Sequence, residues 1–319
     1  MRDNLDPLVS LSAGNGDGSL LGAAAGDVAG RANSTGYSAL MQQMIVLCYH
    51  LMQREEVTPS QLVEEMAVLG RSTDGPSLYR DPSPAFATWI AAAVDGRQPV
   101  PINTPTAEPA ALVVPIGLWF RRDPEALLTA ASTVAEMFTS DPVSLVAAGA
   151  VAGAVAASTV AQSGPDLVLA GAELAEMTVA RLGLESTAAK DVGLRLRKAV
   201  ALLGKAPLEI AEALTGGQPV GVDTALISIV LAAPVVREPS RIIEGAAALG
   251  GSLLGAMVGA MVGGRVGIRV WPWEIPNDGW FAELGRRLSR GSREYIDLPI
   301  PYDAEEYLMT APEARRYRF

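Results

Sequence analysis

The sequence predicts an all-α protein that folds as a single compact bundle of many helices. Hydrophobic residues make up 49% of the 319 positions and aromatic residues only 5%, and abundant Ala, Gly and Leu suit closely packed helices better than a β-sandwich. Apolar residues also recur at helical spacing along most of the chain. Acidic residues followed by proline, at Asp123-Pro124 and Asp141-Pro142, are typical of helix starts.

Charge and cysteine content exclude several classes of function. The formal net charge of −10 would repel phosphate backbones, so we expect no nucleic-acid partner. The single cysteine, Cys48, rules out an intramolecular disulfide, and together with the single histidine, His50, it rules out a Cys/His zinc site. Both lie on a largely apolar predicted helix and are expected to be packing residues. No apolar stretch of signal-peptide length opens the chain, which predicts a cytoplasmic protein.

The predicted order of elements begins with a polar, glycine-containing lead-in. Residues 1–18 are expected to be flexible, and the helical domain is expected to cover residues 19–290. Ser19 is the predicted N-cap of the first helix, and Thr58, which precedes a proline, is the predicted N-cap of the third. In this part of the chain we predict helices at residues 19–28, 39–53, 58–69 and 86–94. The proline-bearing stretch 95–109 predicts a long surface connection, and such loops often border sites.

The second half continues with apolar helices and ends in an aromatic segment. Residues 143–162 are almost entirely Val, Ala, Leu and Gly, so this helix must be buried on all sides. Further helices are predicted at residues 167–182, 188–203, 222–233 and 283–290. Trp271, Trp273 and Trp280 are expected to anchor the chain's return over the core. The tail 291–319 lacks a core of its own, so we expect it to dock on the domain, on another protein or on a second copy of the chain.

A glycine stripe marks the last core helix, which we predict from residue 250 onward. Glycines at every fourth position of residues 251–267 predict a helical face on which another backbone can approach closely. The uncharged run 245–264 is also long enough to cross a membrane. Gly and Ala contribute little to insertion, however, and Glu244 and Arg265 flank the run within an acidic chain. A buried central helix is the preferred interpretation, and no membrane association is expected.

Several segments, in order along the chain, resemble the ADP-ribosylglycohydrolase superfamily. They read LGAAAGDVAG at residues 21–30, YSALMQ at 37–42, VVPIG at 113–117, GAMVG at 259–263 and WFAEL at 280–284. Matches in this order are more specific together than any one alone. The resemblance implies a single compact, orthogonal multi-helix bundle. It also implies two divalent metal ions, held between an early and a late acidic motif.

Both acidic motifs are missing where the resemblance places them. Positions 38–41 read Ser-Ala-Leu-Met, and positions 252–255 read Ser-Leu-Leu-Gly. Hard cations need several converging carboxylate oxygens, so we expect neither a metal ion nor another cofactor. The sequence therefore predicts a catalytically degenerate member of this superfamily, with a binding, structural or assembly role.

Polar residues at or near the matched positions are candidates for lining a remodelled cleft. They are Asp27, Ser38, Gln42, Glu108 and Ser252. Each also has an ordinary explanation, such as capping a helix or satisfying a buried hydrogen bond, and none is predicted to be catalytic. Two alternatives remain open. One is a metal-independent enzyme that acts on a less charged ligand with Glu108 or Asp27 as its acid-base group, and the other is residual ADP-ribosyl or nucleotide binding.

Overall fold

The computed structural model describes residues 16–31, 37–71, 79–161, 163–217, 220–234, 238–267, 273, 275 and 277–291. Within these residues the chain forms helices and no β-strand, and an isolated parallel bridge joins Ile102 to Thr139. The predicted all-α class is therefore confirmed. Most of the predicted lead-in, the tail beyond Gly291, and Trp271 lie outside the described residues.

The first half of the chain places its helices close to the predicted positions. They are α1 (Gly16–Ala29), α2 (Ala39–Arg54), α3 (Pro59–Gly70), α4 (Pro84–Val94), α5 (Glu108–Leu112), α6 (Val114–Trp119) and α7 (Pro124–Phe138). The predicted connection 95–109 ends inside α5, and no helix was predicted for α5 or α6. These two helices are too short for hydrophobic periodicity to show them.

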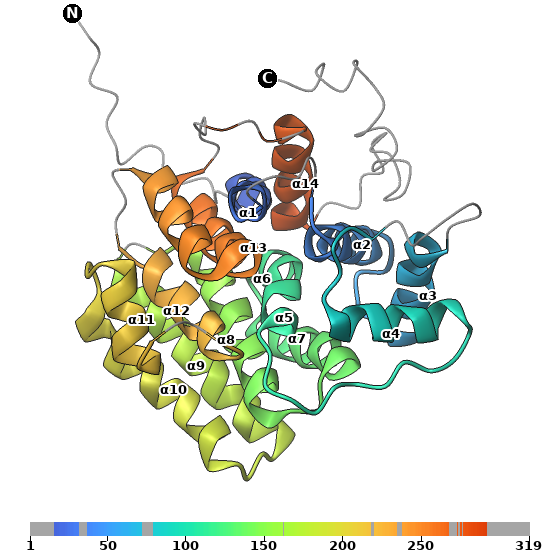
Figure 1. Ribbon diagram of the computed structural model, residues 1–319, viewed down its shortest axis with the longest axis horizontal. Helices are drawn as coiled ribbons and strands as arrows, with labels where there is room; N and C mark the ends of the chain where they lie inside the picture. Colours follow the sequence, from blue (N-terminus) through green and yellow to red (C-terminus); the bar gives the residue numbers. More distant parts are fainter. Residues whose placement is uncertain are drawn as a thin grey trace, which may run out of the picture.

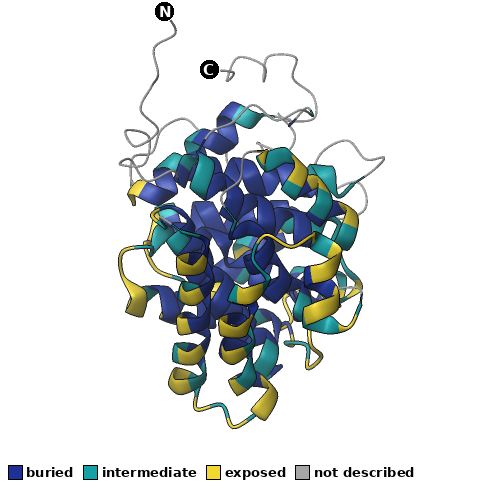
Figure 2. Cartoon of the chain, turned by 90° about the vertical axis from the view of Figure 1, so that its left-hand side faces the viewer, coloured by how far each residue is buried: buried dark blue, intermediate teal, exposed yellow. Residues whose placement is uncertain are grey.

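The second half follows the prediction with shifts at helix ends, except that no helix was predicted at residues 207–215 or 239–249. Its helices are α8 (Pro142–Ser158), α9 (Gly164–Leu182), α10 (Thr187–Ala199), the short 3-10 helix η2 (Val200–Leu202), α11 (Pro207–Thr215), α12 (Asp223–Ala232), α13 (Pro239–Val266) and α14 (Asp278–Arg290). As expected for a helix without a polar face, α8 is buried almost throughout and packs against α7, α9 and α13. Figure 2 shows buried residues filling the interior, with exposed residues on the outer faces of the helices.

Several helices begin on side-chain caps, as their sequences predict. Asp123 accepts a hydrogen bond from the amide of Ala126 at 3.0 Å, and Asp141 accepts one from Ser144 at 2.7 Å. Thr58 precedes α3 at the predicted position, but its side chain makes no capping hydrogen bond. Caps of this kind satisfy amide groups that the helix itself cannot pair.

The predicted cap at Ser19 is wrong, because α1 begins at Gly16 and Ser19 lies within its first turns. The side chain of Ser19 is fully buried, and its Oγ donates to the carbonyl oxygen of Ala260 at 2.9 Å. A hydroxyl can pair with a partner distant in sequence as readily as with its own helix. The residue type therefore could not distinguish a cap from a contact between α1 and α13.

The glycine stripe of α13 packs directly on α1, which lies between α13 and α14 (Figure 1). A Cβ atom on Gly259 would lie 2.0 Å from the carbonyl oxygen of Gly22, and one on Gly255 would lie 2.3 Å from that of Gly26. Helix α1 carries its own matching stripe, so the two backbones touch along antiparallel lines of glycines. The close backbone approach predicted from the stripe is confirmed, and its partner is the first helix of the fold.

A break divides α13 at the start of this stripe. Gly250 and Gly251 have non-helical backbone angles, and Gly251 takes a positive φ of 64°, which glycine adopts readily. The predicted start of the helix at residue 250 thus falls on the break itself. Among the described helices α13 meets the length and composition of a membrane span, and 61% of its apolar window is buried inside the protein. Its unbroken second part, 252–266, is shorter than the roughly 20 residues that a span needs, which favours the buried-helix interpretation.

Cys48 and His50 are packing residues, as expected. Both are fully buried on α2. The Nδ1 atom of His50 lies 2.8 Å from the Oε2 atom of Glu65, and its Nε2 atom accepts a hydrogen bond from the amide of Thr58 at 3.0 Å. The imidazole therefore ties α2 to the start of α3.

The thiol of Cys48 provides a test of this packing. Burial raises the pKa of the thiol, so both access and thiolate formation are suppressed in the native protein. We expect no labelling by an aromatic disulfide reagent under native conditions and one equivalent of labelling in denaturant, with Cys48→Ser as the unlabelled control. Equal reaction rates in the folded and unfolded protein would contradict the structure.

Helix α14 carries a cluster of charged side chains along its own turns, and the stability that this cluster contributes depends on pH. The carboxylate of Glu283 accepts hydrogen bonds from Arg286 Nε at 2.6 Å and from Arg287 Nε at 2.7 Å. The bonds from Arg286, followed by those from Arg287, lower the pKa of Glu283 from its ordinary 4.5 to about 2. The ionised form is thus favoured by folding, so this contribution is present above the ordinary pKa and is lost as pH falls toward the native value.

For Glu283→Gln we expect the free energy of unfolding to fall by about 1 kcal/mol at neutral pH, because the pair is partly screened by solvent. The difference from the unsubstituted protein should shrink toward zero as pH falls from 4.5 to about 2. Urea titrations across this range measure the difference. The exposed Glu125→Gln is the matched control, and a difference that stays constant with pH would contradict the assignment.

Candidate functional site

A cavity of about 450 Å³ opens where helices from both ends of the chain meet. It is lined by Arg31, Ser38, Ala39, Leu40, Gln43, Asp81, Ser83, Phe86, Glu108, Ser252 and Leu253. The cavity therefore brings together residues from the two segments, 38–41 and 252–255, where the resemblance places the acidic motifs. Sequence positions more than 200 residues apart contribute to one wall.

The starts of several helices surround the cavity. Ser38 and Leu40 belong to the start of α2, Ser83 is the N-cap of α4, and Ser252 opens the second part of α13. Glu108 is the first residue of α5. Helix starts carry unpaired amide groups and the positive end of the helix dipole, so each of them favours a nearby acceptor or negative charge.

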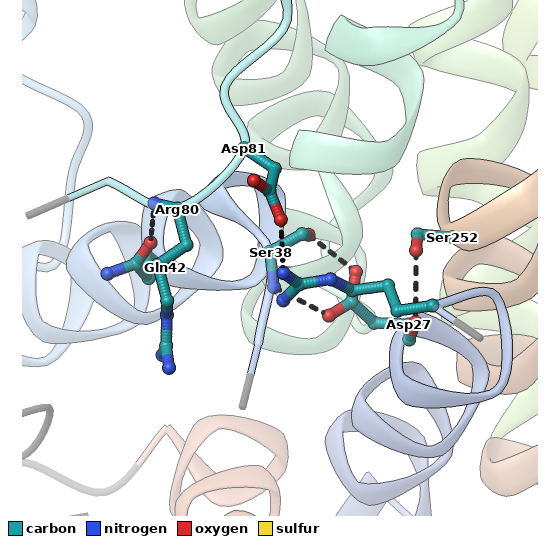
Figure 3. A network of polar contacts seen from close by, with 7 residues as sticks. Asp27, Ser38, Gln42, Arg80, Asp81 and Ser252 are labelled. Atoms are coloured by element: carbon teal, nitrogen blue, oxygen red, sulfur yellow. Dashed lines mark hydrogen bonds and ion pairs between the residues drawn. The ribbon is translucent and has the colours of Figure 1, made fainter. Parts of the chain in front are cut away.

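Asp27 lies behind the cavity wall rather than in it. Its carboxylate accepts two hydrogen bonds from Ser38, one from the amide at 2.8 Å and one from Oγ at 2.5 Å (Figure 3). Burial raises the pKa of Asp27, and the hydrogen bonds from Ser38 act in the opposite direction. Asp27 thus clamps the end of α1 to the start of α2.

Ser252 adds the third helix to this clamp. Its Oγ donates to the backbone carbonyl oxygen of Asp27 at 3.0 Å, so the broken point of α13 is held against α1 (Figure 3). The break at Gly250 and Gly251 is what lets the chain present Ser252 at this point. Three helices therefore meet at one residue of α1.

Glu108 is the most buried acidic side chain that lines the cavity. Its Oε2 atom accepts a hydrogen bond from Ser83 Oγ at 2.9 Å, and Ser83 Oγ in turn accepts one from the amide of Phe86 at 3.1 Å. Burial raises the pKa of Glu108, and the bond from Ser83 acts against this. Glu108 thus joins the start of α5 to the start of α4.

Arg31 and Asp81 form an ion pair at the rim, and Figure 3 shows Asp81 near Ser38. Arg31 lies two residues after the end of α1, and its side chain is largely buried, whereas that of Asp81 is mostly exposed. Gln42 does not line the cavity, since its Oε1 atom accepts a hydrogen bond from the amide of Arg80 at 2.9 Å. The neighbouring Gln43 is the glutamine that reaches the cavity.

Ser38, Glu108 and Ser252 were predicted from the sequence as candidates for lining a cleft, and the structure places all three around one cavity. Sequence reasoning missed Arg31, Gln43, Asp81, Ser83 and Phe86. Ser83 could have been found, because Ser83-Pro84 is the same kind of helix start as Asp123-Pro124. The others carry no local signal, since their place in the site depends on how the helices pack.

The acidic side chains at the cavity do not make a set that suits two divalent metal ions. Asp81 is paired with Arg31, Glu108 with Ser83, and both oxygens of Asp27 are turned toward Ser38. Within the described part of the chain, no group of three or more His, Cys, Asp or Glu side chains could hold a metal ion. Hard cations need several free carboxylate oxygens at one point, and this geometry does not supply them.

The helical bundle and its cavity define a class of protein, and sequence comparison names it. The model of the ADP-ribosylglycohydrolase family matches residues 15–298, so the chain belongs to this family. A solved structure described as "ADP-ribosylglycohydrolase-related protein complex" is 17% identical, covers 88% of this chain and 98% of its own, and has a TM-score of 0.63. At this identity the likeness concerns the fold alone. No curated protein sequence matches the chain.

Proposed function

We propose that this member of the ADP-ribosylglycohydrolase family is catalytically degenerate, and that its cavity binds a small molecule without metal ions. The observation that carries this proposal is the state of the acidic side chains. The cavity has a volume of about 450 Å³, but Asp81 is paired with Arg31, and Glu108 already accepts a hydrogen bond from Ser83 at one of its two oxygens. Its volume falls within the roughly 300–1,000 Å³ of typical small-molecule sites.

The wall composition supports binding over metal-dependent hydrolysis. Leu40 and Leu253 present apolar surface where a hydrated cation would need oxygen ligands. A mixed apolar and polar lining of this kind suits an organic ligand better than an inorganic ion.

Calorimetry and a hydrolysis assay test the loss of metal chemistry. We expect purified protein to bind neither Mg²⁺ nor Mn²⁺ stoichiometrically and to release no ADP-ribose from a modified protein. An active hydrolase of the same family, treated in parallel, controls for the quality of the substrate. Stoichiometric metal binding together with ADP-ribose release would overturn the proposal.

A metal-independent enzyme is the second candidate, and Glu108 favours it. A buried carboxyl group with a raised pKa can serve as a general acid or base. The structure offers Glu108 no second free acid-base group in the cavity, because Asp81 is held by Arg31. Turnover of a bound ligand that Glu108→Gln abolishes, with ligand affinity kept, would support this candidate over simple binding.

A further inference from the structure

The hydroxyl groups of the cavity wall have their hydrogen atoms committed to the protein. Ser38 Oγ donates to Asp27, Ser83 Oγ donates to Glu108, and Ser252 Oγ donates to the carbonyl oxygen of Asp27. A hydroxyl that has given away its only hydrogen can offer a ligand nothing but its lone pairs. These serines therefore act as hydrogen-bond acceptors toward anything in the cavity.

Gln43 and Glu108 add further acceptors. Gln43 is 7% exposed, and its Nε2 donates to the carbonyl oxygen of Ala39 at 3.1 Å, which fixes the orientation of the amide. Its Oε1 atom has no partner among the described residues, although the side chain lines the cavity. Glu108 likewise uses only Oε2 in its bond with Ser83. Both side chains line the cavity, so these oxygens can accept hydrogen bonds from a ligand that donates them.

The charges around the cavity are close to balance. Arg31 and Asp81 neutralise each other at the rim. The starts of α2 and α4 lie at the carboxylates of Asp27 and Glu108, which accept hydrogen bonds from Ser38 and Ser83. The end of α1 meets the start of the second part of α13, and their dipoles oppose each other. Neither a phosphate nor a cation would therefore find an unmatched opposite charge.

Part of the cavity lining is apolar. Ala39, Leu40, Leu253 and Phe86 contribute to it. The aromatic side chain is held rigidly, since Phe86 packs edge-on against Tyr79 at a ring separation of 4.8 Å and stacks on Trp89 at 6.0 Å. A ligand thus meets both hydrogen-bond acceptors and hydrocarbon in the lining of the cavity.

We propose that the ligand of this cavity is a neutral polyol of monosaccharide size, whose hydroxyl groups donate to Gln43, Glu108 and the wall serines. Its carbon face packs on Leu40, Leu253 and Phe86. This inference rests on the proposed metal-free binding function and specifies the ligand class for it. Hydroxyl groups supply the hydrogens that the wall lacks, and neutrality matches the balanced charges.

A matched series of sugars tests the charge of the ligand. D-Glucose, protonated D-glucosamine and D-glucuronate share one ring and differ in charge, and myo-inositol serves as a second neutral polyol. In NMR titrations we expect glucose or myo-inositol to bind about tenfold more tightly than either charged sugar, about the cost of leaving one charge unmatched. Tighter binding of a charged sugar overturns the ligand class, and so does the absence of binding by both neutral probes at millimolar concentration.

Two variants of α2 test whether the neutral probe binds in this cavity. Gln43→Met keeps the volume of the side chain and removes the unpartnered oxygen, so we expect about tenfold weaker binding of the neutral probe that binds best. Gln53→Met, on an exposed position of the same helix, should leave binding unchanged. Equal affinity in both variants would place the probe elsewhere and overturn the proposal.

Glu108→Gln tests the role of the negative charge of Glu108. Its readout is the ratio of the affinities for D-glucuronate and D-glucose, which a general loss of structure would not change in one direction. This change removes the negative charge and keeps the shape, so D-glucuronate should gain affinity relative to D-glucose. An unchanged ratio contradicts the proposed contact. Tighter binding of a charged sugar without metal ions would contradict the neutral ligand class but not the proposed function. Stoichiometric Mn²⁺ binding with ADP-ribose release would contradict the proposed function itself.

Discussion

Gly259→Ala is expected to lower the free energy of unfolding by at least about 3 kcal/mol, or to prevent stable folding. The added methyl group would lie 2.0 Å from the carbonyl oxygen of Gly22, far inside contact distance. The neighbouring atom is backbone, so no side-chain rotation can relieve the overlap. The two helices would have to separate along the whole stripe, and packing would be lost around each of its glycines.

Urea denaturation and the yield of soluble protein measure this effect. Gly245→Ala is the matched control, because it lies on the same helix and its Cβ would make only an ordinary contact of 3.4 Å with Pro207. That control should be neutral or stabilising by up to about 1 kcal/mol, since alanine favours helix over glycine. Gly22→Ala should resemble Gly259→Ala, and the double variant should cost less than the two single changes together, because they disrupt one contact. Unchanged stability of Gly259→Ala would refute the close packing of α1 on α13.

Asp27→Ala is expected to lower the free energy of unfolding by about 3 kcal/mol. Removal of the carboxylate leaves the buried amide and hydroxyl of Ser38 without their acceptors. It also loosens the joint between α1 and α2, on which the cavity wall depends. Asp27→Asn should cost less, because an amide retains one acceptor oxygen but presents its NH₂ group to the second donor.

The control for this position is Asp95→Ala. Asp95 forms an exposed ion pair with Arg97 at 2.8 Å, and such pairs contribute little, so the change should stay within about 0.5 kcal/mol. Urea titrations compare the variants. Similar stability of Asp27→Ala and Asp95→Ala would show that the clamp at Ser38 contributes little to the fold.

The all-α class and most helices could be predicted from the sequence, because local signals carry this information. Proline after a capping residue marks the starts of α7 and α8, and apolar periodicity marks the bodies of the longer helices. The short helices α5 and α6 escaped prediction, since neither spans two turns of periodic pattern. Ser19 was assigned to a cap because its partner, Ala260, lies far away in sequence.

The candidate site was only partly accessible to sequence reasoning. Ser38, Glu108 and Ser252 were found through their positions near altered motifs or in a long proline-bearing stretch. Arg31 and Asp81 were not, because an ion pair between two segments 50 residues apart leaves no pattern in either. The choice between Gln42 and Gln43 also depended on the rotation of α2, which neighbouring helices determine.

By itself, the sequence determined that the protein is helical, that two stretches of the chain lack carboxylates, and that one helix carries a glycine stripe. Each of these is a property of residue type and spacing. Only the tertiary structure decided that α1 is the partner of that stripe and that the two stretches without carboxylates border one cavity. It also decided that the carboxylates at the cavity are already engaged. Contacts between distant segments depend on the packing of whole helices, and no local stretch of the sequence determines that packing.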